Sequence, residues 1–468
     1  MSNEHFEPFL YLAGLTHDAA LIAWGGFFFK TSAQSGRWKL IDDGDLKKIE
    51  PPRGDTIGAS SKPYGKARVE VRDSGGNVAG GRETSEANHC WIENLSPDTE
   101  YTYRVFVNGQ PWAEGELYDW SREGGQHGLL KSGRVYDNRF RTHPAPDSPA
   151  SLTFAAIGDF GVGVRKESSN NRRQIEIAEA LEKAADSQKI RIVLTTGDNI
   201  YAGKTFFHIP IGATGDEDDD WFFTFYQPYR YVINRIPFYP ACGNHDTMET
   251  ESSDDRKQLE DNFYINERFS GPHSSGPVSR DPGLFYRFGF GSNIEFVCVD
   301  TTRKSMFFGT RFYDHDKHRE FMDTAFPPGA GTRRWLIPFM HHPVFSAGPT
   351  HKIHSSMVER LGGRFVRSGV RIVLAGHEHN YQHALDKGVN YFITGSAGKV
   401  STNPPSRLAE AHTVSWASQA HLLLVELSGD TATVRPIGGA NPNGGLVELN
   451  VNRNGQLSPG AVTISAGG

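Results

Sequence analysis

Side chains that can bind metal ions recur where five short apolar stretches of the sequence end. The five polar clusters span residues 158–161, 197–201, 243–246, 341–343 and 376–379. Each contains a glycine or adjoins a turn, which lets the backbone bend so that a side chain projects past the end of a strand. The clusters together offer carboxylate, amide, phenol and imidazole groups, and no thiolate: Asp159, Asp198, Tyr201, Asn244, His245, His341, His377 and His379.

The mixture of ligand types predicts two different metal positions. Carboxylates and a phenolate suit a hard, highly charged ion, whereas imidazoles and an amide oxygen suit a borderline divalent ion. Tyr201 discriminates most sharply between metals. A free tyrosine titrates at about pH 10, so a phenolate ligand is reasonable only beside a strong Lewis acid such as Fe(III).

The stretches before the clusters predict an α/β sheet. Residues 152–157 and 192–194 indicate strands, and apolar residues at three-residue steps from Ile175 to Ala184 indicate a helix between them. Further strands are expected at 238–241, 294–299, 335–340, 371–374, 391–394 and 422–427, and a further helix at 318–324. Almost every strand ends at a polar cluster, and strand ends are where α/β sheets place their sites.

The first 140 or so residues have a different pattern of predicted secondary structure, with strands and no long helices. Short β-prone runs at 19–24, 67–71, 101–107 and 138–142 lie between glycine-rich turns. Residues 94–105 and 139–142 resemble the end of a fibronectin type III or immunoglobulin-like sandwich, where a tyrosine packs at a strand corner. A proline-rich segment then indicates a linker. We expect a fibronectin/immunoglobulin-like all-β sandwich at 1–147, an α/β domain at 148–437 and a C-terminal tail at 438–468 with few apolar anchors.

The ordered clusters resemble the motifs of the calcineurin-like metallophosphoesterases. The tyrosine of the 197–201 cluster resembles specifically that of the purple acid phosphatases, and the resemblance covers roughly residues 151–400. It implies an α/β metallophosphoesterase domain of the αββα sandwich type. It also implies an acid phosphatase whose substrates are small-molecule phosphate monoesters, hydrolysed by attack of metal-bound hydroxide.

The resemblance implies a role for each of the eight residues. Fe(III) would be held by Asp159, Tyr201 and His379. A second ion, ferrous iron, zinc or manganese, would be held by Asn244, His341 and His377, and Asp198 would bridge both ions. His245 would face the substrate and donate a proton to the leaving group.

Two positions depart from the family pattern. Pro338 stands where the family usually has a valine, so the choice of His341 over His342 as a ligand depends on the following Pro343. The segment 348–351 resembles the mammalian tartrate-resistant enzymes, but its loop is shorter and lacks the histidine that those enzymes carry just before it.

Two other functions fit the same residues. A phosphodiesterase or phospholipase-like activity would use the same dimetal core, with Mn(II) in place of mixed iron. Alternatively, the N-terminal sandwich would make the chain an interaction module with a vestigial core, although an intact set of eight site residues argues against decay. The Asp-Phe-Gly sequence at 159–161 is also found in kinases, but the other kinase motifs do not precede it.

Several polar residues are expected to be structural. Asp246 is expected to orient its loop through hydrogen bonds, and the acidic run at 216–220 fits a helix cap. In a chain with 19 histidines, several will lie near any site by chance, so we expect none of the following to be a ligand: His315, His318, His351, His354 and His383. The three cysteines, Cys90, Cys242 and Cys298, are too scattered for a disulfide framework and are expected to be buried thiols.

Size and charge limit the classes of partner. A chain of 468 residues usually forms more than one core. The net charge of −6 does not favour nucleic acid. The longest apolar stretch, 19–29, has about half the length of a membrane span and lacks the basic flank of a signal peptide. A cytoplasmic protein is therefore expected, or a secreted one if a leader has been removed.

Overall fold

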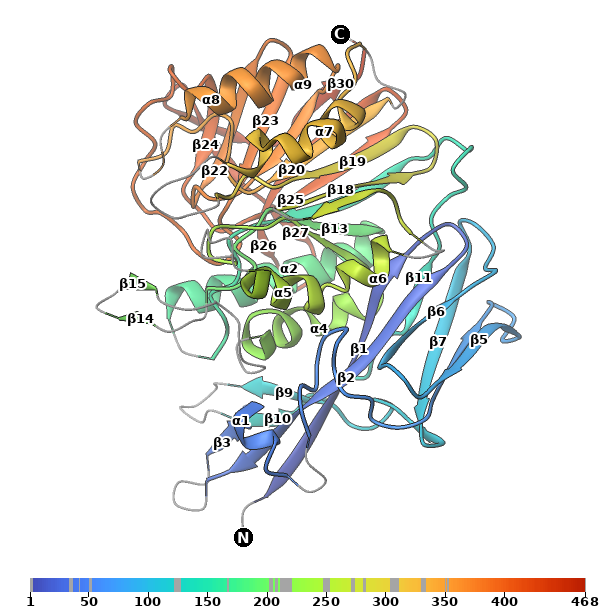
Figure 1. Ribbon diagram of the computed structural model, residues 1–468. Helices are drawn as coiled ribbons and strands as arrows, with labels where there is room; N and C mark the ends of the chain where they lie inside the picture. The colour runs from blue at the N-terminus through green and yellow to red at the C-terminus, as the bar shows by residue number, and fades with distance from the viewer. Residues whose placement is uncertain are drawn as a thin grey trace.

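A computed structural model describes most of the chain, and its helices and strands are drawn in Figure 1. The described residues are 3–32, 37–41, 43–49, 53–121, 128–165, 168–201, 205–206, 209–210, 221–246, 253–270, 274–280, 283–303, 311–329, 334–349, 351 and 353–467. The acidic run at 216–220 lies outside these ranges. No described helix is long and apolar enough to cross a membrane.

The N-terminal region is rich in strands, as predicted, and most of them form two antiparallel sheets. One sheet contains β1 (Glu4–Leu15), β2 (Ala20–Thr31), β3 (Trp38–Leu40) and β6 (His89–Ile92). The other contains β11 (Arg139–Arg141), β7 (Glu100–Val107), β4 (Ala67–Arg72), β5 (Val78–Thr84) and β8 (Gln110–Pro111). Alternate residues of β7 are buried, and they share one apolar cluster with β1 and β2. A small pair, β9 (Tyr118–Ser121) and β10 (Gly128–Lys131), completes the region.

Two large sheets form the centre of the α/β part of the described chain. The first contains β16 (Phe238–Pro240), β13 (Ile192–Thr195), β12 (Leu152–Ile157), β25 (Leu422–Ser428), β26 (Thr431–Ala440), β27 (Leu446–Glu448) and β30 (Val462–Ser465). The second contains β17 (Val278–Arg280), β18 (Leu284–Phe290), β19 (Ile294–Val299), β20 (Trp335–Met340), β21 (Ile372–Ala375), β23 (Val389–Thr394), β22 (Tyr381–Asp386), β24 (Thr413–Ala417), β28 (Asn450–Arg453) and β29 (Gln456–Pro459).

Helices cover the outer faces of the two sheets (Figure 1). Phe154 of β12 and Phe296 of β19 meet edge to face, 5.1 Å between ring centroids, in the core between the sheets. The helix α2 (Ser169–Ser187) packs on the first sheet and α4 (Gln227–Ile233) packs on α2. The helices α7 (Arg319–Ala325), α8 (Ser355–Met357) and α9 (Gly363–Arg367) share an apolar cluster with the second sheet. The layers follow the predicted order, αββα.

The C-terminal tail is more structured than its composition suggests. The strands β27 and β30 pair with β26, and β28 pairs with β24, so the tail extends both sheets. Leu449, Val451 and Ile464 are buried. These three apolar side chains fix the tail to the α/β layers.

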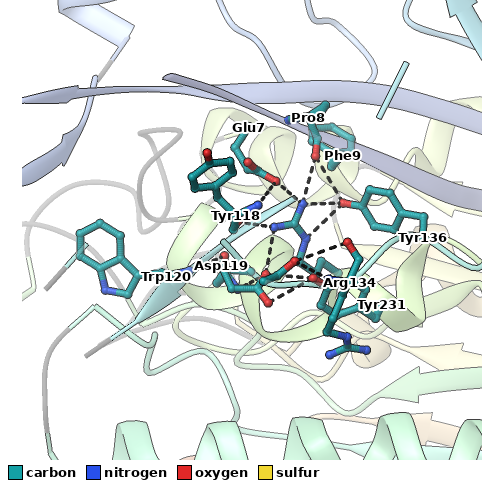
Figure 2. Close-up of polar contacts among 12 residues, drawn as sticks. Glu7, Pro8, Phe9, Tyr118, Asp119, Trp120, Arg134, Tyr136 and Tyr231 are labelled. Atoms are coloured by element: carbon teal, nitrogen blue, oxygen red, sulfur yellow. Dashed lines mark hydrogen bonds and ion pairs between the residues drawn. The ribbon is translucent and has the colours of Figure 1, made fainter. Parts of the chain in front are cut away.

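A buried arginine of α4 joins the N-terminal strands to the α/β layers, and its partners Glu7, Tyr118, Asp119 and Tyr136 are labelled in Figure 2. Arg230 of α4 is 3% exposed and donates to Glu7 Oε1 at 2.6 Å, Asp119 Oδ1 at 3.0 Å and Tyr136 Oη at 2.9 Å. It also donates to the backbone carbonyl of Tyr118 at 2.7 Å. Because a buried charge is costly unless it is paired, this network fixes the position of the N-terminal region.

Candidate metal centre

Three of the predicted ligands lie in left-handed backbone turns just past the ends of strands. Asp159, Asp198 and His377 follow the ends of β12, β13 and β21, with φ values of 54°, 50° and 70°. Residues other than glycine rarely adopt positive φ, and such strain is concentrated at functional sites. Gly243 lies so close to Asp198 that a Cβ atom there would collide with its backbone and carboxylate. The loop that carries Asn244 therefore lies directly against Asp198.

The first set of predicted ligands surrounds one oxygen of Asp159. Tyr201 Oη donates to Asp159 Oδ1 at 3.0 Å, and His379 Nε2 lies 3.3 Å from the same oxygen. Tyr201 Oη and His379 Nε2 are 3.4 Å apart. Asp159 Oδ2 accepts the backbone N–H of His377 at 2.9 Å, which fixes the orientation of the carboxylate.

The second set surrounds the Nε2 atom of His341. This nitrogen lies 2.9 Å from Asn244 Oδ1, 3.1 Å from His377 Nδ1 and 3.3 Å from Asp198 Oδ1. His341 Nδ1 lies 2.8 Å from the carbonyl oxygen of Thr196, which can only accept a hydrogen bond. In the neutral imidazole the proton therefore sits on Nδ1, and the lone pair of Nε2 faces the other ligands.

Asp198 connects the two sets. Carboxylate oxygens of Asp198 and Asp159 and a ring nitrogen of His341 all lie within 4.8 Å of one another. Burial alone would raise the pKa of Asp198, but the imidazoles of His341 and His245 lower it to about 2. Conversely, burial lowers the pKa of His341, and Asp198 and Asp159 outweigh that effect and raise it. The carboxylates thus favour positive charge between them.

The donor atoms fit two metal ions. Oxygen and nitrogen ligands lie about 2.0–2.2 Å from such an ion, so ligands of one ion lie about 3 Å from each other. The contacts around Asp159 Oδ1 and around His341 Nε2 have this spacing, 2.9–3.4 Å. Burial, followed by Asp159 and Asp198, raises the pKa of Tyr201 well above its usual range, so its phenol keeps the proton unless a strong cation displaces it.

His245 lies beside the first set of ligands. Its backbone N–H donates to Asp198 Oδ1 at 3.0 Å, and its ring centroid lies 4.6 Å from that of Tyr201. Burial lowers the pKa of His245, and the charge of Asp198 offsets part of this effect. The structure therefore brings all eight predicted site residues together, seven through ligand atoms and His245 through its backbone and ring.

Asp246 orients its loop, as the sequence predicts. Its carboxylate is buried and accepts the backbone N–H of Gly243 at 2.7 Å, Asn199 Nδ2 at 2.8 Å and the backbone N–H of Ile200 at 3.2 Å. These bonds join the loop of Asn244 to the loop of Asp198 and Tyr201.

His342 is close to the second set of ligands but has other contacts. Nitrogens of His341, His342 and His377 lie within 4.8 Å of one another. His342 Nδ1 lies 3.1 Å from Thr301 Oγ1, which also accepts the His342 backbone N–H at 2.9 Å. His341 is the histidine that contacts both Asn244 and Asp198. The geometry thus supports the preference for His341.

Two residues that sequence reasoning did not place in the site lie at its edge. The His351 ring lies 3.7 Å from that of His377 and 6.3 Å from that of His379, and the Lys399 ammonium lies 4.3 Å from the centre of the Tyr201 ring. Burial and the neighbouring imidazoles lower the pKa of His351 to about 4. The Gly-Pro-Thr-His sequence at 348–351 was a signal for His351, whereas Lys399 has no motif around it.

Two of the other histidines that we did not expect to be ligands contact residues outside the two sets. His318 stacks on Phe285 with 4.0 Å between centroids, and His383 Nε2 lies 2.9 Å from Asn390 Oδ1. The three cysteines are buried and free, as predicted.

Known proteins resemble this chain in sequence over the region that contains the proposed centre. A family model described as calcineurin-like phosphoesterase matches residues 152–381. Tartrate-resistant acid phosphatase type 5 of Oryctolagus cuniculus is 24% identical over 273 residues, 54% of this chain and 74% of that protein. Fe(3+)-Zn(2+) purple acid phosphatase 12 of Arabidopsis thaliana is 25% identical over 303 residues, 64% of this chain and 52% of that protein. The chain thus spans between half and three quarters of these two relatives.

Two solved structures share the fold over nearly the whole chain. Purple acid phosphatase PPD1 from yellow lupin (Lupinus luteus) seeds has a TM-score of 0.58 at 14% identity, covering 98% of this chain and 74% of that one. A structure of PhoD has the same TM-score, 0.58, at 14% identity, covering 98% of this chain and 93% of that one. The N-terminal strands are therefore included in both likenesses.

Proposed function

We propose that this chain is a purple acid phosphatase-like enzyme that hydrolyses phosphate monoesters at a centre of two metal ions. The match of residues 152–381 to the calcineurin-like phosphoesterase model supports the proposal. The main structural support is the arrangement of the predicted ligands. The side chains of the seven predicted ligands meet as two sets, around Asp159 Oδ1 and around His341 Nε2, and Asp198 lies between the sets.

In this proposal each set holds one ion. Asp159, Tyr201 and His379 would hold Fe(III), Asn244, His341 and His377 would hold a divalent iron, zinc or manganese ion, and Asp198 would bridge them. The raised pKa of Tyr201 favours a trivalent ion there, because a weaker cation would leave the phenol protonated. When bound, the two ions would supply an activated water and would neutralise the charge of the phosphoryl group.

His245 would hold the proton that the leaving group needs. The hydrogen bond from its backbone to Asp198 fixes the ring beside Tyr201, at the edge of the proposed centre. An imidazole must be protonated to act as a general acid, and burial lowers the pKa of His245. Turnover should therefore decrease as the pH rises through that lowered pKa, which gives an acidic optimum.

Leaving-group dependence tests this role. His245→Ala should keep both metals while turnover falls by about two to four orders of magnitude. The loss should be smaller for aryl phosphates, whose alcohol leaves readily as an anion, than for alkyl phosphates. His17→Ala, in the N-terminal region, is the matched control and should leave both rates unchanged. An equal loss for aryl and alkyl substrates would contradict proton donation by His245.

Comparing monoesters with diesters tests the reaction class. Turnover of p-nitrophenyl phosphate should exceed that of bis(p-nitrophenyl) phosphate on the metal-loaded protein. Faster diester turnover would favour the phosphodiesterase or phospholipase-like alternative. A protein that binds both metals and hydrolyses neither ester would favour an interaction module with a vestigial core.

We also propose that the N-terminal sandwich, up to about residue 147, is fibronectin type III-like. The backbone N–H of Ser96 donates to Tyr101 Oη at 2.8 Å, close to the start of β7. A tyrosine that bonds back to the backbone a few residues upstream is the strand corner seen in this class of sandwich.

A further inference from the structure

Lys399 belongs to a segment that is fixed to the proposed metal centre. Its backbone N–H donates to the carbonyl of Asp159 at 3.1 Å, and the backbone N–H of Ser401 donates to the carbonyl of His379 at 2.7 Å. The residue before Lys399 is Gly398, where a Cβ would lie 2.8 Å from the carbonyl oxygen of Phe160. The backbone that carries Lys399 therefore keeps a constant position relative to the centre.

The ammonium group of Lys399 and the ring of the proposed proton donor, His245, both lie beside the Tyr201 ring. Its Nζ atom is 4.3 Å from the centre of the Tyr201 ring, and that ring is 4.6 Å from the ring of His245. Burial is the main cause that lowers the pKa of His245, and the nearby charge of Lys399 adds to it. Among the described residues, no carboxylate forms an ion pair with Lys399. Within that part of the structure, its ammonium is therefore available to a bound ligand.

We propose that Lys399 selects phosphate monoesters whose leaving group carries a second anionic group, a carboxylate or a further phosphate. The inference rests on the proposed function and specifies its substrate class. The leaving group must approach His245 to receive a proton, which brings its substituents toward the Lys399 ammonium. A charge-assisted contact at that position favours an anionic substituent over a neutral one of the same size.

Two phosphonates of similar size test the inference by binding rather than by turnover. Phosphonoacetate carries a carboxylate where n-propylphosphonate carries an ethyl group. Calorimetric titration of the metal-loaded wild-type protein should give about tenfold tighter binding of phosphonoacetate, the size expected for one charged contact. Lys399→Met should reduce this ratio to about one, and Lys399→Arg should restore most of it.

Lys39→Met is the matched control, because it removes the same charge from an exposed position on β3 of the N-terminal region. It should keep the tenfold ratio. If Lys399→Met keeps that ratio while n-propylphosphonate still binds, the inference is wrong and the proposed function stands. If Lys399→Met shifts the visible absorption band of the metal-loaded protein but leaves the ratio of the two phosphonate affinities unchanged, the inference is also wrong. Lys399 would then act only on Tyr201. Wild-type protein that binds two metals and neither phosphonate would overturn the proposed function itself.

Discussion

The substitution Asp246→Asn tests how strongly the two loops that carry proposed metal ligands depend on one buried carboxylate. Asp246 is 1% exposed and accepts three hydrogen bonds, from the backbone of Gly243, the side chain of Asn199 and the backbone of Ile200. In Asp246→Asn one oxygen remains, which can accept from two donors at most. The third donor then faces an NH₂ group.

The expected loss of stability follows from the number of buried donors that lose their acceptor. One buried donor without a partner costs about 1–3 kcal/mol, so Asp246→Asn should lower the free energy of unfolding by that amount. Asp246→Ala leaves all three donors without their acceptor and should cost about 3 kcal/mol or more. Loss of a group that orients metal ligands typically lowers metal affinity by about 10- to 100-fold.

Urea denaturation of the metal-stripped protein measures the stability effect, and competition with a chelator measures metal affinity. Asp73→Asn is the matched control, because Asp73 accepts a hydrogen bond from the backbone of Asn77 in an exposed turn. It should change the unfolding free energy by less than about 1 kcal/mol. If Asp246→Asn changes neither the unfolding free energy nor the metal affinity, Asp246 does not hold the two loops together.

Three further changes have defined outcomes. Asp198→Ala should reduce the metal content to one ion or none and abolish turnover, measured by elemental analysis beside a phosphatase assay, and full activity would rule out a bridge. Arg230→Met leaves the buried Glu7 without its guanidinium and should cost about 3–5 kcal/mol in urea denaturation, part of which Glu7→Gln should recover in the double variant. Burial lowers the pKa of His421 to about 4, so between pH 6.5 and about 4 the unfolded chain takes up a proton that the folded chain does not. This destabilises the fold toward low pH by about 3 kcal/mol, and His421→Asn should flatten that part of a stability profile measured against pH.

The strands that the sequence predicts best are those buried on both faces. Strands β12, β19 and β20 have the predicted bounds, because a strand covered on both sides reads as a continuous apolar run. β1 was not predicted, since it contains Pro8, which argues against a strand unless the strand lies at an edge. The structure places β1 at the edge of its sheet. The tail strands were also missed, because they are only three or four residues long and contain few apolar side chains, even though β27 pairs with β26 and β28 with β29 close by in the sequence.

The ligand-type residues of the site were predictable because each lies in a short motif at the end of an apolar strand. The glycines beside these residues are visible in the sequence, whereas the left-handed conformations of Asp159, Asp198 and His377 are visible only in the structure. His351 and Lys399 differ, since their relation to the site is made by tertiary contacts with His377 and Tyr201. Asp246 was predicted as an orienting residue, but the identity of its partners depends on two loops that meet only in the fold.

Metal analysis together with the visible spectrum of the purified protein tests the central claim most directly. We expect two metal ions per chain, one of them iron, and a visible band from charge donated by the Tyr201 phenolate to Fe(III). Tyr201→Phe should be nearly colourless and should lose iron more readily than the divalent ion, while its fold is retained. A fully active protein with two manganese ions and no visible band would contradict the iron–phenolate assignment.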